Sequence, residues 1–173
     1  MIKAKLYILT GLPYAGKTTL TNELVNRFGF SVVSVDEFID EKGFEVEQMS
    51  QDDWGLVYSK TYERLKKYLT DGKTVILDIG NLKRSERETA RRIAESMGVE
   101  HKLIYVNTPI EEVKKRREAN QQTQERGHLE DATINRALSM FEEPTPDEKP
   151  TFYNQPVNLD SWIKENIAHK VLG

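Results

Sequence analysis

The sequence contains no cysteine, only three histidines and no long hydrophobic run. Without cysteine, neither a disulfide framework nor a thiolate zinc site can form, and the composition suits a reducing compartment. His101, His128 and His169 do not have the spacing of metal ligands. The first ten residues lack the apolar core of a signal peptide, and no run approaches the roughly 18 residues of a membrane span. We therefore expect a soluble, cytoplasmic protein that does not enter a membrane.

An excess of charge of one sign is also lacking, because 25 lysines and arginines nearly balance 28 acidic residues to give a net charge of -3. No global basic field favours nucleic acid, so such binding would need a local basic stretch. The chain has 173 residues, of which 38% are hydrophobic and 31% are charged, as is ordinary for a globular protein. This length predicts one domain over residues 1–173 with a single core.

Four short apolar runs are separated by segments with helical periodicity, and each is typical of a buried strand. They are Lys5–Thr10, Ser31–Val35, Thr74–Ile79 and Lys102–Asn107. We expect a fifth strand at Val157–Leu159, followed by a helix from Ser161 to about Lys170. Alternation of strands and helices favours right-handed crossovers. It predicts a three-layer α/β fold with a mostly parallel five-stranded sheet and helices on both faces.

The segments between the strands carry helix start signals. An apolar stripe with helical spacing runs from Trp54 to Tyr68, and Ser50 is its expected N-cap. Ser85 and Glu88 form a capping-box pattern before the next helix. Thr108 is the expected cap of the helix that follows the fourth strand, because a proline follows it directly.

The stretch GLPYAGKTT (Gly11–Thr19) directly follows the first expected strand and precedes a helix. Its two glycines allow the backbone to fold tightly, so that successive N–H groups point at phosphate oxygens. Lys17 would reach the β- and γ-phosphates of ATP, and the Thr18 hydroxyl would coordinate Mg²⁺. The pattern predicts the P-loop NTPase fold, with a nucleotide site made of Gly11, Pro13, Tyr14, Ala15, Gly16, Lys17, Thr18 and Thr19.

Other motifs distinguish between the classes of P-loop proteins. A GTPase would have a D-x-x-G switch after its third strand and an N-K-x-D motif that reads the base. This chain has DIGN after the third strand and no N-K-x-D. A large motor ATPase would need a longer chain. We therefore expect a small kinase, in which the loop presents a γ-phosphoryl group to an acceptor across the carboxyl edge of the sheet.

Two aspartates follow expected strands at this edge. Asp36 comes after VSV, where its carboxylate could accept the proton of an attacking hydroxyl group. The alternative is that Asp36 only caps the next helix. Asp78 follows TVIL and could hold Mg²⁺ or orient the acceptor, although a plain aspartate at a strand end is also common.

A polar and basic stretch, KKRREANQQTQER, runs from Lys114 to Arg126. Guanidinium groups suit the negative charge that spreads over the phosphoryl oxygens during transfer. A polar segment that closes over bound nucleotide is common in kinases. We expect a kinase-type lid over about residues 114–130, with Arg116, Arg117 or Arg126 closing over the transition state. A solvated basic helix face is the alternative.

Five stretches together resemble a group of small P-loop kinases, the AAA_33-like ATP-binding proteins. This group includes zeta toxins, chloramphenicol phosphotransferase and the kinase domain of polynucleotide kinases. The stretches are GLPYAGKTT, VSVDEFI, VILDIGNLKRSERE, NTPIEEVKKRRE and MFEEPTPDE, and they lie between about Lys5 and Glu148. The resemblance implies ATP- and Mg²⁺-dependent transfer to a hydroxyl group, with Asp36 as general base and arginines after the fourth strand as the lid.

The resemblance also bears on the acceptor. Polynucleotide kinases carry an arginine three residues after the aspartate and tend to have a second lid arginine, whereas this chain has Ile39 and Asn120 at those positions. The VDEFI stretch is more similar to the chloramphenicol enzyme. We therefore expect a small, neutral hydroxyl compound as acceptor and a protein that acts as a monomer or homodimer. A polynucleotide 5'-hydroxyl kinase and a non-enzymatic ATP-binding switch remain the alternatives.

Overall fold

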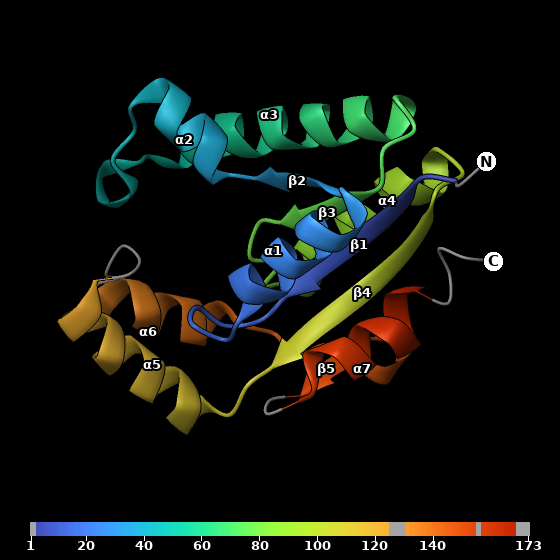
Figure 1. Ribbon diagram of the computed structural model, residues 1–173. Helices are drawn as coiled ribbons and strands as arrows, with labels where there is room; N and C mark the ends of the chain where they lie inside the picture. The colour runs from blue at the N-terminus through green and yellow to red at the C-terminus, as the bar shows by residue number, and fades with distance from the viewer. Residues whose placement is uncertain (1–2, 125–130, 155–156, 169–173) are drawn as a thin grey trace.

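A five-stranded sheet forms the centre of the computed structural model, which describes residues 3–124, 131–154 and 157–168 (Figure 1). Its strands are β1 Lys5–Thr10, β2 Ser31–Ser34, β3 Val75–Asp78, β4 Glu100–Asn107 and β5 Thr151–Asn154. They lie in the order β2-β3-β1-β4-β5, and every pair is parallel. The central strand β1 is almost continuously apolar and buried, as expected for a parallel strand that is covered on both faces.

Helices connect the strands and cover the sheet. The described helices are α1 Lys17–Phe28, α2 Asp36–Lys42, α3 Gln51–Thr70, α4 Arg84–Ser96, α5 Ile110–Thr123, α6 Asp131–Met140 and α7 Leu159–Ile163. Short 3-10 turns occur at Val46–Gln48 and Pro146–Glu148, and a π-helical turn at Lys164–Ala168 continues α7. Within the described ranges, every helix is too short or too polar to cross a membrane.

The two sides of β1 pack into different cores, because successive side chains of a strand point to opposite faces. Tyr7 and Leu9 belong to a buried cluster that also contains residues of α1 and α7. Leu6 and Ile8 belong to a second cluster with residues of α3 and α4. The predicted three-layer α/β fold with a five-stranded parallel sheet is therefore confirmed.

Strand β5 forms one edge of the sheet and is fixed by α7. The indole Nε1 of Trp162 donates to the carbonyl of Phe152 at 2.8 Å, and the ring of Tyr153 packs edge-on against Trp162 with centroids 5.0 Å apart. The prediction of a fifth strand at Val157–Leu159 is wrong. Val157 packs against the core outside the sheet, and α7 already begins at Leu159.

Two of the sequence expectations about helix ends have opposite outcomes. At the start of α3, Ser50 Oγ accepts from the N–H of Asp53 at 3.1 Å, and the Asp53 carboxylate accepts from the N–H of Ser50 at 2.8 Å. The predicted cap is confirmed as a full capping box. The box predicted at Ser85 is wrong, because α4 begins one residue earlier at Arg84 and Glu88 pairs with an arginine of the same helix at 2.6 Å.

Candidate active site

The phosphate loop connects β1 to α1 and lies against β4. A methyl group added at Gly11 would come within 2.8 Å of the carbonyl oxygen of Val106, so only glycine fits without a shift of the backbone. Gly16 precedes α1 with a φ of 108°, a conformation that favours glycine. Tyr14 adopts a φ of 63° in the same loop. A non-glycine residue in this region is uncommon and is found at functional sites.

The loop ends in the side chains that the sequence pattern singles out. The ammonium group of Lys17 donates to the Gly11 carbonyl at 2.5 Å, so the lysine lies back along the loop. Thr18 and Thr19 are exposed in the first turn of α1. Because the first N–H groups of a helix have no partner within it and its dipole is positive at this end, this turn is suited to bind an anion.

Residues at and after the end of β4 donate hydrogen bonds to backbone carbonyls of the phosphate loop. The hydroxyl of Thr108 donates to the carbonyl of Ala15 at 2.6 Å, so this residue is not the helix cap that its position predicts. Arg116 of α5 donates to the carbonyls of Ala15 and Tyr14 at 3.0 and 3.3 Å. Its Nε also pairs with Glu112 one turn earlier. The structure therefore brings Arg116 into direct contact with the phosphate loop.

The other predicted arginines lie elsewhere or outside the described residues. Arg117 points toward α6, which begins just beyond the expected lid, and pairs with Asp131 at 2.6 Å. It joins α5 to α6, and the guanidinium is largely buried in this position. Arg126 lies outside the described residues, as does the rest of the segment 125–130 within the expected lid 114–130.

The two predicted aspartates lie at the carboxyl ends of adjacent strands. Asp78 ends β3 and pairs in register with Ser34, the last residue of β2. Asp36 lies two residues after Ser34, as the first residue of α2, and is exposed. Because β3 also pairs with β1, both aspartates share the sheet edge from which the phosphate loop leaves. Ligands of open parallel sheets bind at this edge.

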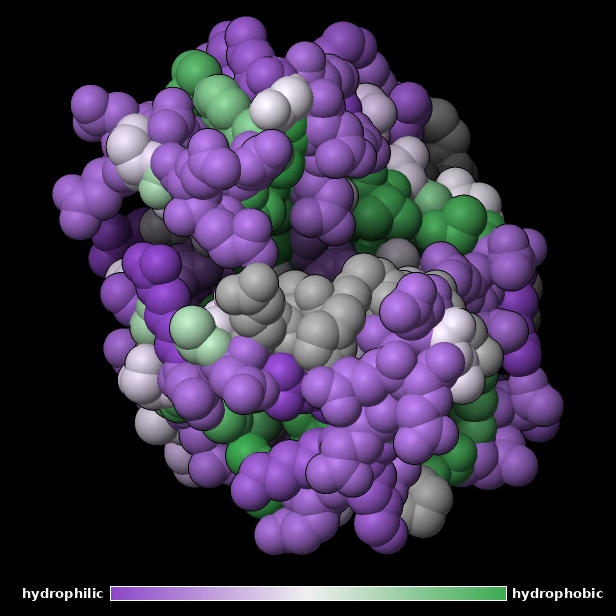
Figure 2. Space-filling model, turned by 90° about the vertical axis from the view of Figure 1, so that its left-hand side faces the viewer, coloured by the Kyte–Doolittle hydropathy of each residue, from purple (hydrophilic) through white to green (hydrophobic). Residues whose placement is uncertain are grey.

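The surface over this edge is seen in Figure 2, which faces the left-hand side of Figure 1. In this view, helices α2 and α3 lie at the top, and helices α5 and α6 lie at the bottom. Most of this face is hydrophilic, and it is hollowed between the two pairs of helices (Figure 2). A polar, concave surface beside a phosphate loop is suited to a charged or hydroxylated ligand.

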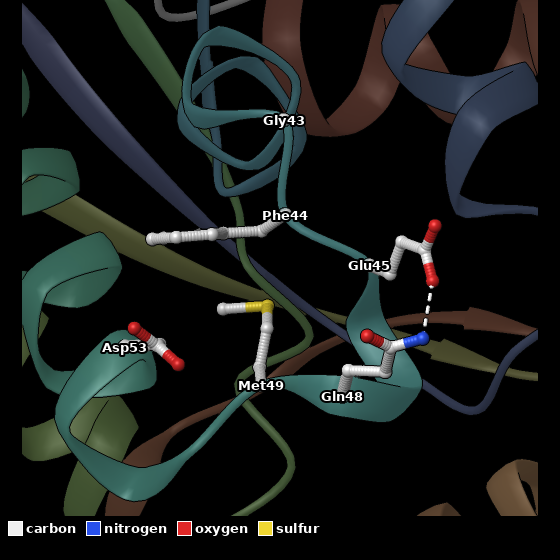
Figure 3. Close-up of a pocket in the computed structure, with 6 residues that line it drawn as sticks. All are labelled: Gly43, Phe44, Glu45, Gln48, Met49 and Asp53. Atoms are coloured by element: carbon white, nitrogen blue, oxygen red, sulfur yellow. Dashed lines mark hydrogen bonds between the residues drawn. The ribbon is translucent and has the colours of Figure 1, made fainter.

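A separate cavity of about 290 Å³ lies where α2 turns into α3 (Figure 3). Phe44 and Met49 form its apolar wall, and Asp53 lies beside them. Glu45 and Gln48 are hydrogen bonded to each other at 2.6 Å on the other side. The rings of Trp54 and Tyr58 lie next to each other on α3, tilted by 36° with centroids 6.0 Å apart.

Sequence reasoning missed a buried polar group behind the phosphate loop. Asn81 is fully buried after β3, and its side-chain N–H donates to the Leu9 carbonyl at 2.9 Å. Its own carbonyl accepts from the Thr10 hydroxyl at 2.8 Å. Asn81 thus ties the loop after β3 to the end of β1, directly before Gly11. The only sequence signal is the asparagine of DIGN, which solvent exposure would have explained equally well.

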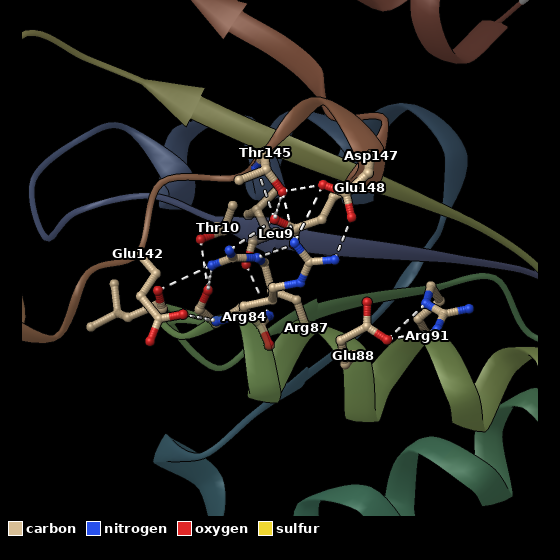
Figure 4. A network of polar contacts seen from close by, with 12 residues as sticks. Leu9, Thr10, Arg84, Arg87, Glu88, Arg91, Glu142, Thr145, Asp147 and Glu148 are labelled. Carbon is tan, nitrogen blue, oxygen red and sulfur yellow. Dashed lines mark hydrogen bonds and ion pairs between the residues drawn. The ribbon is translucent and has the colours of Figure 1, made fainter.

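A buried ion pair also stabilises the loop after β3 (Figure 4). Arg87 Nε lies 2.7 Å from Glu148 Oε1, and the two side chains are 2% and 5% exposed. The guanidinium also donates to the carbonyls of Asn81 and Leu82 at 3.1 and 3.0 Å. Burial raises the pKa of Glu148, but the hydrogen bonds from Arg87 and from the Thr145 backbone outweigh it, and the pKa is lowered.

A glycine loop with Lys17, placed between the central strand of a parallel sheet and a helix, defines a P-loop protein. The family described as "AAA domain" matches residues 6–144, and the chain belongs to it. The resemblance to the small P-loop kinases is confirmed. A search of curated proteins found no match.

Solved structures share this fold over nearly the whole chain. Kti12 of Chaetomium thermophilum in complex with ADP-AlF3 is 18% identical with a TM-score of 0.74, over 97% of this chain and all of that one. A putative kinase from Chloroflexus aurantiacus is 17% identical with a TM-score of 0.73, over 98% and 99% of the chains. The Mycobacterium tuberculosis APS kinase CysC, in complex with AMPPNP and APS, is 17% identical with a TM-score of 0.67 over both full chains. At these identities the likeness shows the fold.

Proposed function

We propose that this protein is an ATP- and Mg²⁺-dependent phosphotransferase that moves the γ-phosphoryl group to a hydroxyl group of a small molecule. The observation that carries the proposal is the contact of Arg116 with the phosphate loop. A loop that only binds nucleotide has no need of an arginine from a polar helix, whereas phosphoryl transfer gains from such a charge beside the phosphoryl oxygens. Solved P-loop proteins of the same fold include kinases, which supports the reaction type.

Each residue has a definite role in this reaction. The loop N–H groups and Lys17 would hold the β- and γ-phosphates, and Arg116 would stabilise the charge on the transferred group. The acceptor oxygen attacks the γ-phosphorus while Asp36 accepts its proton, and the bond from the γ-phosphorus to the bridging oxygen breaks to release ADP. Asp36 is suited to this role because it is exposed at the sheet edge on a short helix.

The residues present also suit Mg²⁺. The Thr18 hydroxyl, in the first turn of α1, and the Asp78 carboxylate, at the end of β3, would supply oxygen ligands at the sheet edge where the phosphate loop leaves β1. Mg²⁺ usually takes only one or two ligands from the protein and the rest from phosphates and water. This agrees with the described residues, which contain no cluster of three or more acidic, histidine or cysteine ligands. When bound, the ion neutralises charge on the β- and γ-phosphates.

The charge of the acceptor side favours a small molecule over a nucleic acid. Between positions 36 and 53, eight residues are acidic and one, Lys42, is basic. The nearby Arg64 is already paired with Glu37 and Glu41. A phosphate backbone would be repelled here, since binding of nucleic acid relies on lysines and arginines that neutralise phosphates. The cavity beside Phe44 and Met49 offers an apolar wall for a small acceptor.

ADP release tests this proposal. Purified protein with ATP and Mg²⁺ is screened against a panel of hydroxyl compounds and a 5'-hydroxyl oligonucleotide at several salt concentrations. We expect a small hydroxyl compound to raise ADP release above the rate with water alone. Stimulation only by the oligonucleotide, with a steep salt dependence, would instead indicate a polynucleotide kinase. No stimulation by any acceptor would favour the ATP-binding switch.

With the acceptor in hand, Asp36→Asn is expected to lower the rate of transfer by about 10²- to 10⁴-fold, the usual contribution of a general base. ATP affinity, measured by titration calorimetry, is expected to stay nearly unchanged because Asp36 does not belong to the phosphate loop. Asp40→Asn is the matched control, since Asp40 is another exposed aspartate of α2. Equal rates in the Asp36 variant and the control would remove Asp36 from this role.

A further inference from the structure

The helix pair α5 and α6 is attached to the phosphate-loop region where the chain enters α5 and where it leaves α6. At its start, Thr108 and Arg116 donate to carbonyls of the loop. At its end, the chain leaving α6 is bonded to the segment after β3, because the N–H of Glu142 donates to the Leu82 carbonyl at 2.8 Å. The helix pair therefore has two separate attachments, and only the first of them contacts the phosphate loop itself.

The second attachment is completed by the Arg87–Glu148 pair. Arg87 uses its planar guanidinium to bind the Glu148 carboxylate with two nitrogens, Nε and Nη2, at 2.7 and 3.2 Å. Its Nη1 binds the carbonyls of Asn81 and Leu82. The carbonyl of Asn81 also accepts from Thr10, the last residue before the phosphate loop. A continuous series of buried and partly buried hydrogen bonds thus joins the segment after α6 to the end of β1 (Figure 4).

A buried ion pair is not the most stabilising solution at such a place. Desolvation of two charges offsets most of their attraction, and an apolar pair of similar volume is often as stable or more stable. The fork of an arginine, however, fixes the relative positions of the groups that it binds, because its donors lie in one plane. This geometry constrains the direction in which the chain leaves α6. The ring of Phe141, packed on Tyr105 of β4 with centroids 5.8 Å apart, constrains it further.

We propose, on the basis of the proposed function, that Arg87 and Glu148 are positioning residues, which orient helices α5 and α6 so that Arg116 contacts the phosphate loop. Arg117 of α5 pairs with Asp131 of α6 at 2.6 Å, so an ion pair joins the two helices. A change at the Arg87–Glu148 pair is thereby transmitted to Arg116 without contact with the nucleotide. The expected signature is a loss of turnover and of nucleotide-dependent order in α5, with folding retained.

Three variants separate positioning from stability. Glu148→Gln removes the charge and leaves Arg87 buried without its ion partner. The double variant Arg87→Met/Glu148→Leu replaces the pair by apolar groups, so its thermal midpoint is expected to return close to that of the wild type. Asp147→Asn is the matched control, since Asp147 lies in the same turn and pairs with Arg84 but is 61% exposed.

Two readouts are measured at a temperature at which all variants are folded. The first is hydrogen exchange of residues 110–123 with and without AMPPNP, and the second is kcat with the identified acceptor. In the wild type and Asp147→Asn, we expect AMPPNP to protect α5. In Glu148→Gln and in the double variant, we expect this protection to be lost and kcat to fall by about 10- to 100-fold, as for misplaced catalytic groups. KM for ATP should change less than kcat.

The outcomes decide between a positioning and a structural role. If the double variant recovers both its thermal midpoint and the protection of α5, the pair serves only stability and the proposal is overturned. An unprotected α5 in the wild type with AMPPNP overturns it as well. If no acceptor is found for the wild type but the pattern of protection is as expected, the proposed reaction fails while the positioning role stands.

Discussion

Replacement of Gly11 by alanine tests whether the phosphate loop depends on its close approach to β4. The new methyl carbon would lie 2.8 Å from the carbonyl oxygen of Val106 and 3.3 Å from its Cβ. Both groups belong to a buried strand in the middle of the sheet, so the loop must give way. To reach an ordinary van der Waals separation, the loop must move by roughly 0.5 Å or more. Overpacking of this kind costs about 1–3 kcal/mol.

This displacement is expected to affect both stability and nucleotide binding. For a chain of this length, about 2 kcal/mol corresponds to a fall in Tm of about 4–8 °C. A shift of about half an ångström takes one loop N–H out of hydrogen-bond range of a phosphate oxygen, and a charge-assisted bond is worth about 1.5–3 kcal/mol. The Kd for AMPPNP should therefore rise at least about tenfold.

The matched control is Gly55→Ala, in the middle of α3. An added methyl group there meets no atom within 4 Å. Alanine is favoured over glycine inside a helix by about 0.5–1 kcal/mol, so Tm should rise while the Kd for AMPPNP stays the same. Differential scanning calorimetry and titration calorimetry measure the two quantities. A Gly11→Ala protein with wild-type Tm and wild-type Kd would refute the reasoning, because the contact with Val106 would then not constrain the loop.

Two further predictions concern stability. Ser50→Ala removes the side-chain acceptor of the α3 capping box and should lower the free energy of unfolding in urea by about 1 kcal/mol, whereas an unchanged value would show that the cap is replaced by water. The lowered pKa of Glu148 gives a pH dependence with a definite sign: its stabilising contribution is present above the ordinary glutamate value of 4.5 and is lost as the pH falls below it. Unfolding measured between about pH 3 and pH 6 should show a weaker acid dependence for Glu148→Gln than for the wild type, and parallel curves would contradict this.

The parts of the fold that rest on local patterns could be predicted from the sequence. The strands β1 to β4 coincide with short apolar runs of the sequence, and β1 and β3 are the most completely buried of them. The phosphate loop is defined by the spacing of its glycines and Lys17. In the structure, a strand precedes this loop and a helix follows it, as the sequence predicts. Roles of individual residues in binding or transfer stay predictions.

Features that depend on distant pairings could not be read from the sequence. Strand β5 is a four-residue run after a proline, with Phe152 exposed, and it is a strand only because β4 provides its partner. Arg87 lies in a highly charged stretch of sequence, but it is buried because it pairs with Glu148, 61 positions away. Thr108 has the position of a helix cap and binds Ala15 across the phosphate loop instead. In each case tertiary contact overrides the local signal.

The Trp162 hydrogen bond to Phe152 has a consequence for association between copies of the protein. An edge strand offers unpaired backbone groups that another strand can join, which is a route to aggregation. Both outer strands, β2 and β5, have only four residues, and on β5 the carbonyl of Phe152 is already occupied by the indole. Extension of the sheet by a strand of a second molecule is therefore disfavoured at this edge, although the exposed ring of Phe152 offers an apolar contact there.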